Sequence, residues 1–133
     1  MKTFEVQGIE INAPFDKAFK YISDSHNLPQ WTNAFKSVNG KSVVMRSPNG
    51  DVEIKLKVNS SKEFGTVDWF MTFPDKSVAS AYSRLIKMND KTCAYSFVLM
   101  APPVVLEDIE GALKQQSKIL SHEMKKLKGI LEK

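Results

Sequence analysis

The chain has 133 residues, of which 42% are hydrophobic and 26% are charged, and its formal net charge at pH 7 is +4. This length suits one domain with a substantial core, and the composition is that of a globular protein and excludes a disordered or fibrous chain. No run approaches the roughly 18 apolar residues of a membrane span. The lysines are interspersed with acidic residues and form no basic cluster with aromatic ones, so we expect a solvated surface and no nucleic-acid partner.

Three observations predict a cytoplasmic protein without a metal or other cofactor. The first six residues lack the apolar segment of a secretory signal. Cys93 is the single cysteine, so an internal disulfide cannot form and a reducing compartment is expected. His26 and His122 lie far apart in the sequence, which does not match the ligand spacing of a metal site.

The first strand is predicted over residues 3–12. Phe4 and Val6 occupy the apolar positions before Gly8, and the apolar phase shifts by one residue after it. A phase shift at a glycine indicates a β-bulge and a bent strand.

Two short helices are expected next. Pro14 suits the first position of a helix, and Leu28–Trp31 predicts a second short helix or a turn. The buried face of the first helix is predicted from Phe15, Ala18, Phe19 and Ile22.

From residue 41 the pattern predicts a meander of antiparallel hairpins. Asn49-Gly50 is the strongest hairpin-turn signal in the chain. Trp69 lies on the apolar face of one later strand, and Tyr95 and Phe97 lie on that of another. The strand after the turn alternates cleanly, and its predicted inward residues are Val52, Ile54, Leu56 and Val58.

The loops Asp75-Lys76 and Asp90-Lys91 determine the predicted register of the strand between them. If each is a two-residue loop, both hairpins place the same residues on the inner face of the sheet, whereas an odd-length loop would reverse one assignment. The inner-facing residues are then Val78, Ser80, Tyr82, Arg84, Ile86 and Met88.

A long helix is predicted over residues 103–132. Its apolar residues recur at three- and four-residue steps and form one broad stripe. Gln116 and Glu123 fall inside this stripe, where a polar group either reaches water at the edge or faces a cavity.

The order of these elements predicts an α+β fold in which a curved antiparallel sheet wraps around the long C-terminal helix, with two short helices after the first strand. A curved sheet rarely closes fully on a straight helix, so a cavity is expected between them. Three motifs match a known family: Ile11-x-Ala13-Pro14-Phe15, Phe19-x-x-Ile22-x-Asp24 and Leu28-Pro29-x-Trp31.

With the element order, these motifs resemble the START-like (Bet v 1-like, SRPBCC) superfamily, in particular its polyketide cyclase/dehydrase-type members. The resemblance spans residues 1–133 and implies a single domain with the helix-grip fold. It also implies a choice among ligand carriers, aromatic cyclases and Hsp90 co-chaperones, because the matched residues define the fold and not an activity.

The candidate ligand-binding residues are those assigned to the cavity side of the sheet and helix. Arg84 is the most informative, because a buried guanidinium needs an anion and Glu123 could supply it. The pair either pins helix to sheet or orients an apolar ligand that carries a carboxylate, phenol or carbonyl. The full set is Trp69, Ser80, Tyr82, Arg84, Tyr95, Phe97, Gln116 and Glu123.

The sequence therefore predicts a module that binds a small hydrophobic or aromatic molecule between sheet and helix, as a monomer or homodimer. One alternative is a cyclase- or hydratase-type enzyme that uses Tyr82, Tyr95 or Glu123 as acid or base, although no catalytic residue is assigned. The other is a co-chaperone-like interaction domain whose cavity is only imperfect packing.

Overall fold

The computed structural model describes residues 3–47, 50–101 and 106–133. Its helices are α1 (Phe15–Ser23), α2 (Leu28–Trp31) and α3 (Leu106–Leu131), and a short 3₁₀ turn, η1 (Ser25–Asn27), joins the first two. Its strands are β1 (Phe4–Ile11), β2 (Phe35–Asn39), β3 (Ser42–Ser47), β4 (Gly50–Ser61), β5 (Thr66–Thr72), β6 (Val78–Asn89) and β7 (Thr92–Met100).

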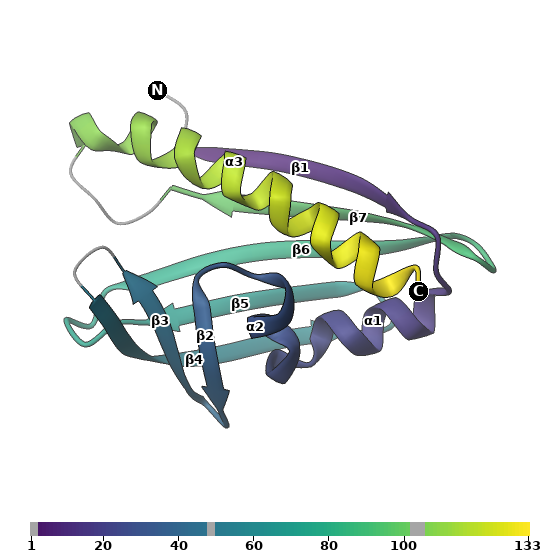
Figure 1. Cartoon of the computed structure of the whole chain (residues 1–133), viewed down its shortest axis with the longest axis horizontal. Coiled ribbons are helices and arrows are strands. Elements are labelled where there is room, and N and C mark those ends of the chain that lie inside the picture. Colours follow the sequence, from purple (N-terminus) through teal and green to yellow (C-terminus); the bar gives the residue numbers. More distant parts are fainter. Residues whose placement is uncertain (1–2, 48–49, 102–105) are drawn as a thin grey trace.

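The strands form one antiparallel sheet in the order β1-β7-β6-β5-β4-β3-β2, and this curved sheet partly surrounds α3. All three helices lie on one face of it, which we call the inner face (Figure 1). The helix α3 runs along β1 and contacts α2. The predicted α+β helix-grip fold, with two short helices after the first strand, is therefore confirmed.

The long helix contributes an apolar stripe to the core, as its periodicity predicts. The prolines before it lie outside the described residues. The buried residues of its described side chains are Leu113, Leu120, Met124, Leu127 and Leu131.

The predicted inward face of β4 is also confirmed. Ile54 and Leu56 are buried, and Val52 and Val58 are half-buried against the core. Gly50, placed by the sequence in a turn, already pairs with Ser47 as a strand residue. The rest of the predicted turn lies outside the described residues.

The predicted register of β6 is wrong on its β5 side. Thr72 pairs with Val78, so the β5–β6 loop has the five residues 73–77 and not two. The Asp75 carboxylate accepts hydrogen bonds from the backbone N–H (2.9 Å) and the hydroxyl (2.6 Å) of Ser77. Lys76 has a φ of 71°, in the left-handed region. An odd-length loop reverses the faces of the strand that follows it.

The β7 side contains a second, separate error. Asn89 pairs with Thr92, so Asp90-Lys91 is the predicted two-residue loop. The register shifts between Lys87 and Asn89, however, and the extra residue, Met88, reverses the phase as a bulge does.

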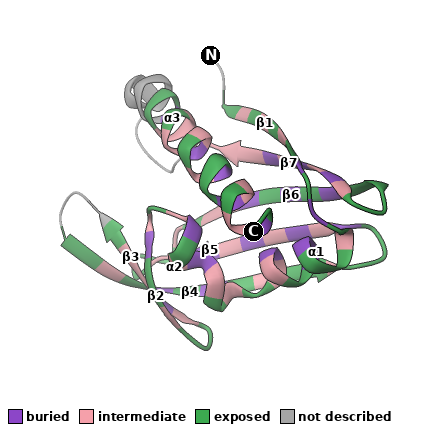
Figure 2. Cartoon of the chain, turned by 45° about the vertical axis from the view of Figure 1, so that its right-hand side comes forward, coloured by how far each residue is buried: buried purple, intermediate pink, exposed green. Residues whose placement is uncertain are grey.

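Together these two features turn β6 over relative to the prediction. Buried and exposed residues alternate along the strand (Figure 2), and Ala81, Ser83 and Leu85 are the buried ones. The residues that lie instead on the outer face are Val78, Ser80, Tyr82, Arg84, Ile86 and Met88.

The predicted bulge at Gly8 is wrong as well. The strand β1 pairs with β7 in one unbroken register from Phe4–Met100 to Ile11–Cys93. Gln7 therefore faces inward, where its Nε2 donates to the carbonyl (2.7 Å) and the hydroxyl (2.9 Å) of Ser117 on α3. Phe4 and Val6 face outward and are 46% and 55% exposed.

Replacing Leu56 with Ala should lower the free energy of unfolding by about 2–5 kcal/mol, because the change removes a buried side chain and leaves a cavity. Lys57 is exposed on the opposite face, and Lys57→Ala should stay within about 0.5 kcal/mol of wild type. Urea unfolding of the two variants measures both values. Equal midpoints for them would mean that the face assignment of β4 is wrong.

Gly65, just before β5, should tolerate alanine much less well than Gly40. Both have positive φ, 72° and 65°, which alone costs about 1–2 kcal/mol for a residue with a Cβ. At Gly65 an added Cβ would also lie 2.0 Å from the carbonyl oxygen of Leu85, whereas at Gly40 nothing lies within 4 Å. Thermal unfolding should show the larger loss for Gly65→Ala, and a loss no greater than that of Gly40→Ala would contradict this backbone contact.

Candidate functional site

Four aromatic side chains form a continuous row on the inner face. Trp31 of α2 meets Trp69 of β5 edge-on, with ring centroids 6.5 Å apart. Trp69 stacks on Phe97 of β7 at 5.7 Å, and Phe97 meets Tyr95 edge-on at 6.5 Å. All four are buried. We call this set the aromatic row.

The strand between β5 and β7 makes the central contact of this row possible. Trp69 pairs with Ala81 on β6, and Phe97 pairs with Ser83. Because both β6 side chains are small, the two large rings can meet above that strand. The hydroxyl of Ser83 donates to the carbonyl of Val67 (2.6 Å) and is thereby satisfied as a donor.

Three polar atoms of the aromatic row have no hydrogen-bond partner among the described residues. They are Nε1 of Trp31, Nε1 of Trp69 and Oη of Tyr95, and all three are fully buried. A buried donor without a partner costs about 1–3 kcal/mol. Burial also raises the pKa of Tyr95, and the Ser83 hydroxyl, which lies near Oη but outside good hydrogen-bond geometry, opposes that rise. Tyr95 is therefore a neutral hydroxyl.

One end of the inner face is covered only in part. At the end of α3 near Leu131 the interior is tightly packed, and Ile11, Leu85 and Cys93 are buried there. At the other end, near the β3–β4 and β5–β6 loops (Figure 1), the apolar side chains are half-buried. This wall, next to the aromatic row, consists of Met45, Val52, Phe73, Ala79 and Leu99.

Polar groups reach the inner face from α3. Glu123 is half-buried and its carboxylate accepts the backbone N–H of Asn33 at 2.6 Å. Burial raises the pKa of Glu123, and the Asn33 hydrogen bond opposes that rise. Gln116 is half-buried on the same helix.

The structure brings together only part of the predicted site. Trp69, Tyr95 and Phe97 lie in the aromatic row. The inward prediction for Ser80, Tyr82 and Arg84 is wrong, because the reversed register of β6 places them on the outer face.

The predicted contact between Arg84 and Glu123 is also wrong. Arg84 is exposed, and its Nε donates to the carbonyl of Phe64 at 3.2 Å. Glu123 lies on the other side of the sheet, with the Asn33 N–H as its partner.

Sequence reasoning missed Trp31, Ser83 and Gln7. The sequence places Trp31 in the second short helix and favours a core position for it over a ligand-binding one, so it is not among the candidate residues, although it is the last residue of α2 and faces the sheet. Ser83 and Gln7 were missed because the predicted phases of β6 and β1 turned them outward.

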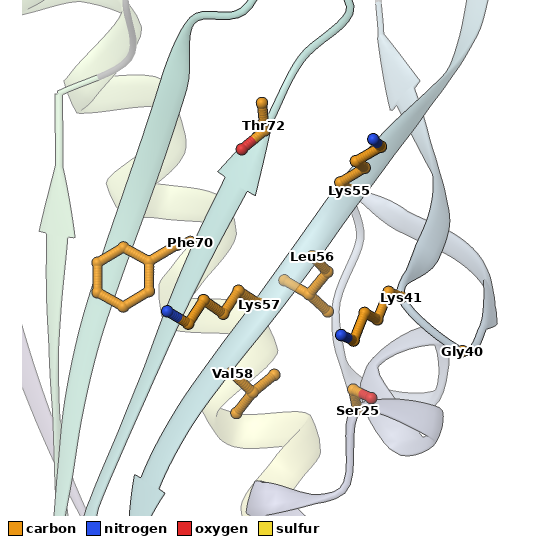
Figure 3. A pocket seen from close by; sticks show the side chains of 9 residues that line it. All are labelled: Ser25, Gly40, Lys41, Lys55, Leu56, Lys57, Val58, Phe70 and Thr72. Atoms are coloured by element: carbon orange, nitrogen blue, oxygen red, sulfur yellow. The ribbon is translucent and has the colours of Figure 1, made fainter.

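A separate hollow of about 570 Å³ lies at the edge of β4 (Figure 3). The strand β3 pairs with β4 only as far as Lys55, so the later part of β4 borders this hollow. None of the eight candidate residues lines it. Its lining is Ser25, Gly40, Lys41, Lys55, Leu56, Lys57, Val58, Phe70 and Thr72.

The described residues hold no cluster of three or more histidine, cysteine or acidic side chains placed for a metal ion. Burial raises the pKa of Cys93, whose thiol donates to the Ala13 carbonyl at 3.2 Å, so it is a poor nucleophile. Within the part of the chain that the structure describes, no helix is long and apolar enough to cross a membrane.

No protein-family model matches the chain, and no curated protein matches its sequence. Solved structures do match its fold. A START superfamily protein from Mycobacterium smegmatis superposes with a TM-score of 0.69 and 11% identity, over 98% of each chain. The Zhui aromatase/cyclase from Streptomyces sp. R1128 has a TM-score of 0.66 and 7% identity, over 97% of this chain and 93% of that one.

The Aha1 dimer from Colwellia psychrerythraea has a TM-score of 0.62 and 18% identity, over 98% of this chain and 97% of that one. At these identities the likeness defines the fold. The chain has the START-like, or Bet v 1-like, helix-grip fold that its motifs indicate.

Glu123→Gln should stabilise the protein at neutral pH and have less effect in acid. The pKa of Glu123 is raised in the folded state above its ordinary value of 4.5, so its contribution to stability is present below pH 4.5 and is lost as pH rises through the folded-state pKa. Glutamine keeps an oxygen for the Asn33 N–H and has no charge to desolvate.

Unfolding in urea between about pH 4 and pH 8 measures this difference. Glu132→Gln is the matched control, because hydrogen bonds from Lys128 and the Asn12 N–H lower the pKa of Glu132. Its effect should have the opposite sign, a loss of stability at neutral pH that fades in acid. A Glu123→Gln protein less stable than wild type at neutral pH would show that burial does not dominate at this carboxylate.

Proposed function

We propose that the protein binds a small hydrophobic or aromatic molecule between α3 and the inner face of the sheet. The observation that carries this proposal is the aromatic row beside a half-buried apolar wall. A ligand on the wall would remove apolar surface from water, at roughly 25 cal/mol per Å². An aromatic ligand on the wall would lie against the border of this buried row.

The burial gradient supports an entry route at one end of the fold. The side chains near Leu131 are closely packed, whereas Ala79 and Leu99 are half-buried beside the deeper Trp69. A ligand that enters over the wall would reach the aromatic row without separating α3 from β1.

A cyclase- or hydratase-type activity in the same place is the second candidate. It is favoured by Glu123, because burial raises the pKa of this carboxyl group in the direction that suits a proton donor. Turnover that falls in Glu123→Gln while ligand affinity stays unchanged would support this enzyme, whereas binding without turnover supports the carrier.

We also propose that the protein acts in the cytoplasm, where a free thiol such as that of the buried Cys93 stays reduced. The proposed oligomeric state is a monomer or a homodimer. An Aha1 protein of the same fold forms a dimer. The interaction-domain alternative has only that distant likeness in its favour.

N-phenyl-1-naphthylamine, an uncharged probe whose emission rises when it leaves water, tests this function. We expect saturable binding, with energy transfer to the probe when tryptophan is excited, because both tryptophans of the chain lie in the aromatic row. Ala79→Leu should weaken binding several-fold by filling space at the wall.

Ser80→Leu is the matched control, since it adds the same side chain one residue further along β6 on the outer face. It should not weaken binding. Probe binding that is absent, or that responds equally to the two substitutions, would rule out the inner face as the site.

A further inference from the structure

The three unpartnered groups of the aromatic row share one chemical property. An indole N–H only donates, and the Tyr95 hydroxyl has a proton to donate. We propose that the ligand of this site presents a neutral hydrogen-bond acceptor, a carbonyl or similar oxygen, at its buried end. This inference rests on the proposed function and specifies which polar group the ligand must carry.

These unpaired donors determine which kind of polar group on a ligand binds best. A purely apolar ligand would leave Trp31, Trp69 and Tyr95 as they are. A ligand whose buried group can only donate would leave both indoles unpaired, because an indole N–H cannot accept. A hydrogen-bond acceptor on the ligand can take up such a proton, and one good hydrogen bond should make binding up to about tenfold tighter.

The charges on the inner face favour a neutral acceptor over a carboxylate or phosphate. Glu123 on α3 and Glu5 on β1 both lie on this side of the sheet. Arg84, the predicted cation, lies on the outer face. A buried anion would therefore lack a counter-charge from Arg84.

In the ligand-free protein the three unpaired donors lower the stability of the folded state. Since the three donors are shielded from water, an acceptor that reaches one of them gains a hydrogen bond without displacing bound water from its N–H or O–H group. Acceptor-bearing ligands should consequently raise the melting temperature more than isosteric ligands that lack the acceptor.

Three tricyclic molecules of nearly the same shape provide the test. Fluorene has no hydrogen-bonding group, 9-fluorenone has an acceptor at the central ring, and carbazole has a donor there. Each is used to displace N-phenyl-1-naphthylamine from the full chain. We expect 9-fluorenone to bind up to about tenfold tighter than fluorene, and carbazole to bind no tighter than fluorene.

The ketone also makes fluorenone the less hydrophobic molecule, so tighter binding has to come from hydrogen bonds. The donors can be removed with little change of shape. Tyr95→Phe removes the hydroxyl, and biosynthetic incorporation of benzothienylalanine replaces the indole N–H by sulfur. Trp31 and Trp69 are the only tryptophans, so this incorporation changes no other site.

The protein that lacks all three donors should melt no lower than wild type and should bind fluorene and fluorenone equally. Tyr82→Phe on the outer face is the control and should keep the preference for fluorenone.

A preference that survives removal of the three donors, or equal binding of fluorene and fluorenone by wild type, overturns the inference and leaves the proposed function standing. If none of the tricycles displaces the probe from the wild-type protein, or if the probe itself does not bind, the proposed function fails with it.

Discussion

The register of β6 is the constraint on which the candidate site depends. The five-residue β5–β6 loop and the extra residue Met88 together turn Ala81 and Ser83 inward. Only because these two side chains are small can Trp69 and Phe97 stack above the strand. With the opposite register, Tyr82 and Arg84 would occupy this space and separate the two rings.

The position of α3 depends on polar contacts at two places along β1. Near the middle of the strand, Gln7 donates to Ser117. At its end, Lys128 donates to the carbonyl of Glu10 (2.7 Å), and Glu132, which pairs with Lys128, accepts the Asn12 N–H (2.7 Å). Such contacts are directional, unlike apolar packing. They hold the helix along one edge of the sheet, which leaves the wall at Ala79 and Leu99 half-buried.

Periodic patterns predicted the elements, whereas loop lengths, a bulge and one distant contact decided the faces of β6 and β1. The alternation around Leu56 and the helical stripe that ends at Leu131 were sufficient, because each is a repeat within one element. The face of β6 depends on the length of a loop, and Asp75-Lys76 looks like a two-residue turn until the Asp75 carboxylate is seen to bind Ser77. The inward turn of Gln7 depends on a partner 110 residues away. No window around Gln7 contains that information. Tyr82 and Arg84 were assigned to the wrong side because periodicity alone reveals neither the length of the β5–β6 loop nor the extra residue Met88.

A purely structural explanation of the unpaired donors is that neighbouring rings accept their hydrogen bonds. An edge-on contact can aim an N–H at a ring face, although such a bond is weaker than one to oxygen. In the Trp31–Trp69 pair only one indole can be the edge that donates to the other's face. If Trp31 donates to Trp69, the N–H of Trp69 is left unpaired. Trp69 stacks on Phe97 at an interplanar angle of 27°, so this N–H is roughly parallel to the Phe97 ring and is not directed at its face. If Trp69 donates, Trp31 is left. Ring contacts within the row therefore leave at least one buried indole donor unpaired, and a phenylalanine at either position would avoid that cost. A core selected for packing alone has no need of an unpaired indole donor, whereas a site that binds an acceptor oxygen does.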